Sequence, residues 1–334
     1  MKDTAVVILN YNGLGFLKHF LPNVIENSPE ADVIVIDNCS TDHSLSFLKE
    51  NFPQTQVICN EKNYGFAGGY NHGLAHISCE NFVLLNSDVE VTPNWLIPIL
   101  KRANGNPNLA AIQPKILDFN KRDHFEYAGA AGGFLDMFGY AFCKGRVFDT
   151  LEKDFGQYQQ TTDIFWATGA CFFVKSKIFK DLGGFDESFF AHMEEIDLCW
   201  RIHNAGFNIQ YEPNSAVYHV GGGTLNKTNP FKTYLNFRNN LAMLYKNLPR
   251  HKLFPIIFAR LILDGISSLK FLKDGNVKDF IAVAKAHFGF YAMIPYLTKK
   301  RNGSYAAYQK LSDFSVVWRY FAKKQKTYTE ICSK

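Results

Sequence analysis

The feature that most constrains the fold is a series of apolar runs that each end in acids or amides. The run VIVI is followed by Asp37, and the run FVLL by Asn86 and Asp88. A third polar cluster, Glu194 and Glu195, opens a helix-like stretch. Strands buried on both faces are apolar, and ligands of α/β sheets bind at the carboxyl ends of the strands. We therefore expect at least two of these clusters to face one crevice.

Residues 1–115 alternate between strand-like and helix-like segments. The expected elements are strands 4–9, 32–37, 55–59, 82–86 and 109–113, with helices 14–26, 42–51, 68–78 and 93–103 between them. Ser40 and Thr41 stand where a helix N-cap is preferred. Pro93, with Thr92 before it as a cap, stands where a first-turn proline is tolerated. This alternation predicts an α/β fold with a mostly parallel sheet and right-handed crossovers.

Residues 116–160 are rich in glycine and aromatic residues, and we expect them to form a long loop over the cleft. The elements expected after it are an ordered segment 163–175, a helix 176–182 ended by Gly183 and Gly184, a helix 194–205 ended by Gly206, strands 207–211 and 216–220 followed by Gly221, Gly222 and Gly223, and a helix over about 230–247. We expect one α/β domain over 1–248 and an amphipathic, basic helical extension over 249–334.

The extension has two stretches with apolar residues at helical spacing, 253–272 and 279–297. Charges inside the first argue against a spanning helix, which needs about 20 predominantly apolar residues. Residues 297–334 hold nine Lys or Arg against two acids, which exceeds the net charge of +5 of the whole chain. The rest of the chain is therefore not basic, and we expect no nucleic acid partner. Instead, we expect contact with an anionic membrane surface, or packing of both stripes against the domain.

The seven cysteines are odd in number and contain no CxxC pair, as is typical of free thiols. The N-terminus passes after Met1, Lys2 and Asp3 into a strand, so we expect no signal peptide. Both features favour a reducing, cytoplasmic compartment.

Five motifs in order resemble those of the inverting family 2 glycosyltransferases with the GT-A fold. They are VVILNYNG from Val6, VIDNCSTD from Val35, NYGFAGGYN from Asn63, LLNSD from Leu84, and GFDE from Gly184 with EEIDLCWR from Glu194. The sequence looks most like the rhamnosyltransferase-like branch, over about residues 4–245. The resemblance implies a hexosyltransferase that uses a UDP- or dTDP-sugar in bacterial surface polysaccharide synthesis.

The resemblance implies a nucleotide site at the strand ends. Asp37 would accept the imide N–H of the base, although an Asp after a strand also caps the following turn. The other residues implied at the nucleotide are Asn10, Asn12, Asn63, Asn71 and Asn86.

The motif Asn86-Ser87-Asp88 stands where the family has its DxD motif. Mg²⁺ or Mn²⁺ would be held by Asp88, because hard cations prefer oxygen ligands and typically add substrate phosphates. His219 matches a residue that this branch places near the diphosphate or metal. Asn86 replaces the first Asp of the motif, so we expect it to contact ribose or to orient Asp88.

The resemblance makes Glu195 the base that takes the proton of the acceptor hydroxyl, with Glu194 as the alternative. Acids in the first turn of a helix are also favoured by the helix dipole. The residues implied on the acceptor side, with weaker matches, are Thr168, Gly169, Asp197, Trp200 and Arg238. The acceptor would be a glycan or a polyprenyl-linked sugar at the inner face of the cytoplasmic membrane.

Three alternative functions can be compared with the sequence. A dinucleotide-binding dehydrogenase would show a third glycine after the first strand, which the segment from Gly13 to Lys18 lacks. A nucleotidyltransferase would have a glycine-rich loop with Arg or Lys there. A non-catalytic carbohydrate- or nucleotide-binding protein with the same fold is favoured only if Glu195 and Asp88 prove dispensable.

Overall fold

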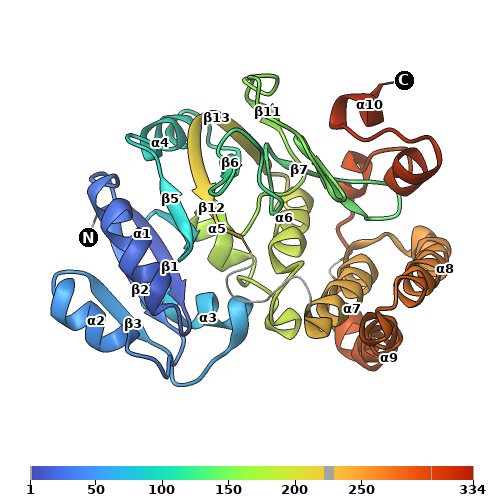
Figure 1. Cartoon of the computed structure of the whole chain (residues 1–334), viewed down its shortest axis with the longest axis horizontal. Coiled ribbons are helices and arrows are strands. Elements are labelled where there is room, and N and C mark those ends of the chain that lie inside the picture. Colours follow the sequence, from blue (N-terminus) through green and yellow to red (C-terminus); the bar gives the residue numbers. More distant parts are fainter. Residues whose placement is uncertain (1, 222–228, 302, 334) are drawn as a thin grey trace.

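The structure, a computed structural model, describes residues 2–221, 229–301 and 303–333. Gly222 and Gly223, expected after the strand that ends near His219, lie outside these ranges. Helices and strands alternate over about the first third of the chain, and helices dominate its C-terminal third (Figure 1).

The strands are β1 (Thr4–Asn10), β2 (Asp32–Asp37), β3 (Gln56–Cys59), β4 (Asn81–Asn86), β5 (Val89–Val91), β6 (Leu109–Asp118), β7 (Gly133–Leu135), β8 (Ala141–Cys143), β9 (Arg146–Val147), β10 (Thr150–Leu151), β11 (Thr162–Asp163), β12 (Cys171–Lys175) and β13 (Asn208–His219). The α-helices are α1 (Leu14–Glu26), α2 (Ser44–Asn51), α3 (Gly65–Leu74), α4 (Leu96–Asn104), α5 (Ser176–Asp181), α6 (Glu194–Asn204), α7 (Pro230–Asn247), α8 (Arg250–Lys273), α9 (Val277–Lys300) and α10 (Tyr328–Cys332). Short helical turns span Glu187–Phe189, Ala306–Lys310 and Trp318–Ala322.

The main sheet has the strand order β11-β13-β6-β12-β4-β1-β2-β3, with β5 also paired to β13. Strands β3, β2, β1 and β4 run parallel, whereas β12 is antiparallel to both of its neighbours. The parallel half follows from the β-α alternation, because parallel neighbours need a crossover connection between them. The carboxyl ends of β1, β2 and β4 therefore lie together at one edge.

Alternate side chains of the buried strands pack on opposite faces of the sheet, as the period of two requires. Ala5 and Val7 join one apolar cluster, and Val6 and Ile8 join the other. Helices α1, α2 and α4 supply apolar side chains to the second cluster. Helices α3, α5 and α6 cover the first face, and α7, α8 and α9 extend the same cluster outward.

The structure corrects several expectations about local elements. Helix α2 begins at Ser44, and the N–H of Ser44 donates a hydrogen bond to Asp42 Oδ1 rather than to Ser40 or Thr41. Helix α4 begins at Leu96, so Pro93 lies in the turn before it. Competing tertiary contacts explain the first shift, since Ser40 Oγ accepts hydrogen bonds from the first strand's loop instead.

The segment 116–160 is more ordered than expected. β6 continues to Asp118, and strands β7 to β10 form a second, four-stranded sheet. The two strands expected at 207–211 and 216–220 are one strand, β13, with a register shift between Glu212 and Ala216. A bulge of this kind keeps a strand continuous although a few residues leave the ladder.

Helices α8 and α9 lie side by side at the end of the molecule farthest from β2 and β3 (Figure 1). Both pack against α7, and Ile256, Phe290 and Leu297 share its apolar cluster. Among the described residues, α9 alone is long and apolar enough to cross a membrane by length and composition.

Candidate active site

Three predicted polar residues lie at neighbouring strand ends. Asn10 ends β1, Asp37 ends β2 and Asn86 ends β4, and these three strands are adjacent and parallel. Asn10 Nδ2 donates a hydrogen bond of 2.9 Å to Asp37 Oδ1. The expectation that two polar clusters would share one edge of the sheet is met in the geometry.

Asp37 has the geometry of a turn cap. It is fully buried, and its Oδ2 accepts a hydrogen bond of 2.8 Å from the N–H of Ser40. Asn12 contacts the same turn, since its Oδ1 accepts a hydrogen bond of 2.7 Å from the N–H of Thr41. Both side chains shape the loop between β2 and α2, and their roles at a nucleotide remain predictions.

Two further residues predicted at the nucleotide make hydrogen bonds within the protein. Asn63 Oδ1 accepts from Asn38 Nδ2 and from the N–H of Gly65, at 2.9 and 2.8 Å. Asn71 holds the backbone of Phe185 with both ends of its amide, at 2.9 Å each. The amide of Asn71 links α3 to the loop before α6, and the nucleotide roles of both residues remain predictions.

His219 lies between two carboxylates. Its Nε2 lies 3.1 Å from Asp88 Oδ1, and its Nδ1 lies 3.2 Å from Glu126 Oε2. Burial alone would lower the pKa of His219, but Asp88 and Glu126 raise it to about 10. Burial alone would likewise raise the pKa of Asp88, but the hydrogen bond to His219 holds it below its ordinary value. All three side chains are buried.

This arrangement has the chemistry of a metal site that needs a substrate. No group of three His, Cys, Asp or Glu in the described ranges is arranged to hold a cation alone. Asp88 supplies a carboxylate oxygen, and His219 supplies a ring nitrogen only after it has lost the proton that Asp88 and Glu126 stabilise; Asn86 Nδ2 lies 3.4 Å from His219 Nε2. Mg²⁺ typically takes one or two protein carboxylates and completes its shell with phosphate and water. The residues present therefore fit a divalent cation that binds together with a diphosphate.

Glu126 was missed by the sequence analysis. A histidine that binds metal usually directs its other ring N–H to a carboxylate, and Glu126 faces Nδ1 of His219. Gly221 packs against the same carboxylate, because an added Cβ would lie 2.8 Å from Glu126 Oε1. Glu126 lies in a stretch without a motif, so only the tertiary structure reveals it.

Glu194 and Glu195 open α6, after two residues with positive φ, His192 and Met193. Glu194 is buried and Glu195 is half-buried. Within the described part of the chain, the Oε2 atom of each has no hydrogen-bond partner, and neither does His192 Nε2. Buried polar groups without partners are rare and point to a ligand or a catalytic role.

Burial raises the pKa of Glu195 to about 7 and, together with the charge of Glu195, raises that of Glu194 well above its ordinary value. Burial lowers the pKa of His192 to about 4, so its ring is neutral at physiological pH. A carboxyl group that titrates near 7 suits a general base. His192 carried no sequence signal, because a lone histidine in a loop has no defining spacing.

The segment from Ala167 to Ala170 joins the strand ends to α6. The carbonyl of Ala170 accepts a hydrogen bond of 3.0 Å from the N–H of Asn86. On the other side, the N–H of Ala167 lies 3.4 Å from Cys199 Sγ, one turn beyond Glu195 on the same face of α6. This segment thus links the end of β4 to the face of α6 that carries Cys199.

Thr168, Gly169 and Arg238, which were predicted on the acceptor side, make contacts within the loops beside α6. Thr168 is buried and hydrogen-bonds the N–H of Ala170, while an added Cβ on Gly169 would lie 2.9 Å from the ring of Phe66. Arg238 donates to the carbonyls of Ser188 and Phe189 at 3.0 and 3.2 Å. These contacts shape the loops beside α6.

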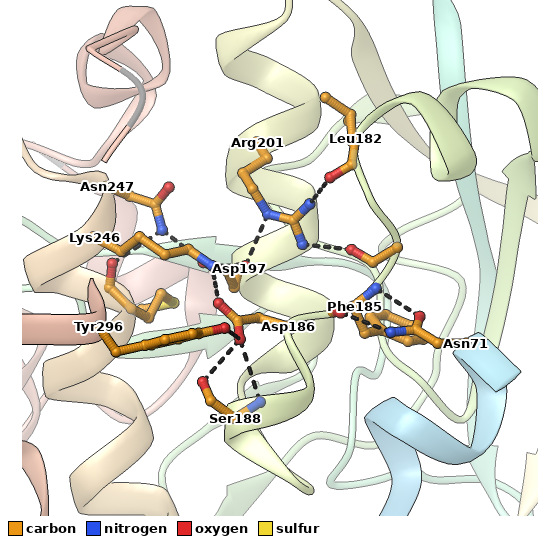
Figure 2. A network of polar contacts seen from close by, with 12 residues as sticks. Asn71, Leu182, Phe185, Asp186, Ser188, Asp197, Arg201, Lys246, Asn247 and Tyr296 are labelled. Atoms are coloured by element: carbon orange, nitrogen blue, oxygen red, sulfur yellow. Dashed lines mark hydrogen bonds and ion pairs between the residues drawn. The ribbon is translucent and has the colours of Figure 1, made fainter. Parts of the chain in front are cut away.

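Asp197 and Trp200, also predicted on the acceptor side, are both fully buried. Figure 2 shows Asp197 in a polar network with Lys246, whose Nζ lies 2.7 Å from Asp197 Oδ2 and 2.8 Å from Asp186 Oδ2. Arg201 Nε lies 2.9 Å from the same oxygen of Asp197. The network fixes α6 against α7, and the roles of Asp197 and Trp200 at an acceptor remain predictions.

The comparisons with known proteins decide the family. Residues 5–183, more than half of the chain, match the family described as Glycosyl transferase family 2. This chain is a member of that family.

Curated relatives agree with this membership. A low-salt glycan biosynthesis hexosyltransferase, Agl10 of Haloferax volcanii, is 24% identical over 72% of this chain and 74% of its own length. An N-acetylglucosaminyl-diphospho-decaprenol L-rhamnosyltransferase of Mycobacterium tuberculosis is 25% identical over 64% of this chain and 75% of its own. The prediction of a hexosyltransferase enzyme is confirmed, and the enzyme acts in glycan or polysaccharide biosynthesis.

Solved structures confirm the GT-A fold. GalNAc-T7, solved with UDP, GalNAc and Mn²⁺, has a TM-score of 0.59 and 18% identity, and the match covers 90% of this chain and 58% of that one. TarS of S. aureus has a TM-score of 0.53 and 17% identity over 97% and 92% of the two chains.

Proposed function

We propose that this family 2 glycosyltransferase moves a sugar from a UDP- or dTDP-sugar to a glycan or polyprenyl-linked acceptor, with inversion at the transferred carbon. The observation that carries the proposal is Glu195. Its carboxyl group is half-buried, has an oxygen without a partner, and titrates at about 7. A group of this kind can take the proton from an acceptor hydroxyl as the new bond forms.

The donor diphosphate would bind beside Asp88 and His219. Mg²⁺ or Mn²⁺, held by these two residues, would supply the positive charge that stabilises the departing nucleoside diphosphate. GalNAc-T7 was solved with Mn²⁺ and UDP, and a mannosyltransferase of Pyrobaculum calidifontis with Mn²⁺ and GDP-mannose, which supports a divalent cation here. Glu126 would orient His219 from behind.

Glu194 has a different task from Glu195 in this proposal. It is buried, and burial together with the charge of Glu195 raises its pKa well above its ordinary value. Two adjacent carboxyl groups with separated pKa values commonly divide the roles of acid and base.

We also propose that the protein is cytoplasmic and works at the inner face of a bacterial cytoplasmic membrane. The basic C-terminal segment and the decaprenol-linked substrate named for the mycobacterial relative support this. The domain boundary near residue 248 belongs to the same proposal, with helices after it facing the membrane.

The test is a panel of nucleotide sugars with the full chain and Mn²⁺. We expect a UDP- or dTDP-sugar to raise the melting temperature and to be hydrolysed slowly, because a preferred ligand stabilises the folded state. Product analysis by NMR with a suitable acceptor would report inversion or retention. Stabilisation without any hydrolysis or transfer would favour the non-catalytic binding protein.

A further inference from the structure

Helix α8 packs Ile256 into the apolar cluster but also turns charged side chains inward. Its inward face carries Arg260 and Asp264, which are both buried. Its outward face carries a line of large apolar side chains at intervals of three or four residues. They are Phe254, Phe258, Ile262, Ile266 and Leu269, with exposed fractions of 50 to 78%. Soluble helices turn their apolar face to the core, so this orientation needs an explanation.

The inward polar face is satisfied by specific contacts. The guanidinium of Arg260 lies 3.8 Å from the ring centroid of Tyr140 and donates to the carbonyl of Phe138 at 3.1 Å. Asp264 Oδ1 lies 3.3 Å from Arg260 Nη2, and Asp264 Oδ2 lies 3.5 Å from His287 Nε2. These contacts fix the rotation of α8, so the outward apolar line is a built feature of the fold.

Helix α9 also turns its carboxylate inward, although most of its buried side chains, such as Val283 and Phe290, are apolar. Its single carboxylate, Asp279, is buried, as is Asp264, the single carboxylate of α8. Its outward side chains include Phe288, which is 74% exposed, and the exposed Lys285. Both helices are described in full, and the outward surface of each is apolar or basic and carries no carboxylate.

The basic residues flank the apolar line. Arg250 and Lys252 lie at the start of α8, and Lys273 and Lys278 lie at the turn between the helices. The one exposed acid of this turn, Asp274, is already paired with Lys270 at 2.7 Å. An apolar face bordered by Lys and Arg is the arrangement of helices that lie in a membrane interface.

We propose that the outward faces of α8 and α9 form a docking surface for an anionic bilayer, with the line from Phe254 to Leu269 inserted among the lipids. This deepens the membrane location in the proposed function and does not depend on its chemistry. A second copy of the chain fits less well. Two such faces carry exposed lysines such as Lys278 and Lys285 and no carboxylate to pair with them, and like charges repel.

The test is co-sedimentation of the full chain with vesicles of phosphatidylglycerol and phosphatidylethanolamine, and with phosphatidylcholine vesicles. Ile262→Glu places a charge in the line, and Ile97→Glu is its matched control, since Ile97 is 45% exposed on α4 and Ile262 is 50% exposed. We expect the parent and Ile97→Glu to bind anionic vesicles alike, and Ile262→Glu to bind at least about tenfold less tightly. Salt should weaken binding only in part.

Phe254→Glu, at a 78% exposed position, serves as a second variant whose folding should not be affected. Unchanged vesicle binding by both line variants would overturn the proposal. A parent that ignores anionic vesicles but forms dimers that Ile262→Glu dissociates would assign the surface to a second copy instead. Donor hydrolysis is measured on the same samples to separate the membrane proposal from the catalytic proposal. Absence of hydrolysis in the parent and in all variants would contradict only the catalytic proposal.

Discussion

Tyr296 on α9 donates a hydrogen bond of 2.9 Å to Asp186, in the loop that leads to α6. Asp186 in turn shares Lys246 with Asp197 of α6 (Figure 2). Although burial alone would raise the pKa of Asp186, Lys246 holds it well below its ordinary value. The C-terminal helices and the helix that carries Glu195 are thus joined through one buried network of charges.

Removal of Lys246 should destabilise the protein strongly. Lys246→Met leaves Asp186 and Asp197 buried without their shared cation, and breaking a buried pair in this way costs about 3–5 kcal/mol. The measurement is urea unfolding at pH 7. Lys177→Met is the matched control, because the pair of Lys177 with Asp181 is exposed and should cost well under about 1 kcal/mol. Equal losses in the two variants would refute a structural role for the network.

Glu195→Gln should lower turnover by about 10²–10⁴-fold while donor affinity stays the same, since the amide cannot accept a proton. In the parent enzyme, turnover should rise with pH through about 7, because Glu195 must be ionised to act as base. Steady-state kinetics from pH 5.5 to 8.5 measure both effects. Glu194→Gln is the informative comparison, and a larger loss there with Glu195→Gln near parental turnover would move the role of base to Glu194.

The same carboxyl groups should weaken the fold at higher pH. Their pKa values are raised in the folded state, so the folded protein holds more protons than the unfolded one above about pH 4.5. Stability contributed by the protonated forms is therefore lost as pH rises through about 7. Glu195→Gln should raise the melting temperature more at pH 8 than at pH 5. A gain that is independent of pH would show that burial does not shift these groups.

The proposed metal site can be tested by substituting its carboxylate ligand, Asp88, and the residue that orients His219, Glu126. With UDP and Mn²⁺ in calorimetric titrations, Asp88→Asn should abolish the dependence of nucleotide affinity on the metal. Glu126→Gln should weaken metal affinity by about 10–100-fold, because it only orients His219. Asp154→Asn, at a partly buried carboxylate paired with Lys115, is a control that should leave metal binding unchanged. Full activity in excess EDTA would contradict the proposed metal dependence.

Local pattern was sufficient for the frame of the site. The strands that end at Asn10, Asp37 and Asn86 were predicted within a residue or two, since apolar runs of that length are buried strands. Helix α7 was predicted at its observed bounds, and the glycines after α5 ended it as expected. Motif order alone was enough to indicate the family, because each motif sits on a strand end or a helix start.

What the sequence by itself determined is therefore the order of elements and which polar residues reach the edge of the sheet. Only the tertiary structure showed that Asp197 lies in a buried network, that Glu126 supports His219, and that α8 turns Arg260 inward and Ile262 outward. Helical spacing predicts two faces but not which of them meets the core. That choice depends on partners far away in the chain, here Tyr140 and His287 for α8, whose contacts no local pattern contains.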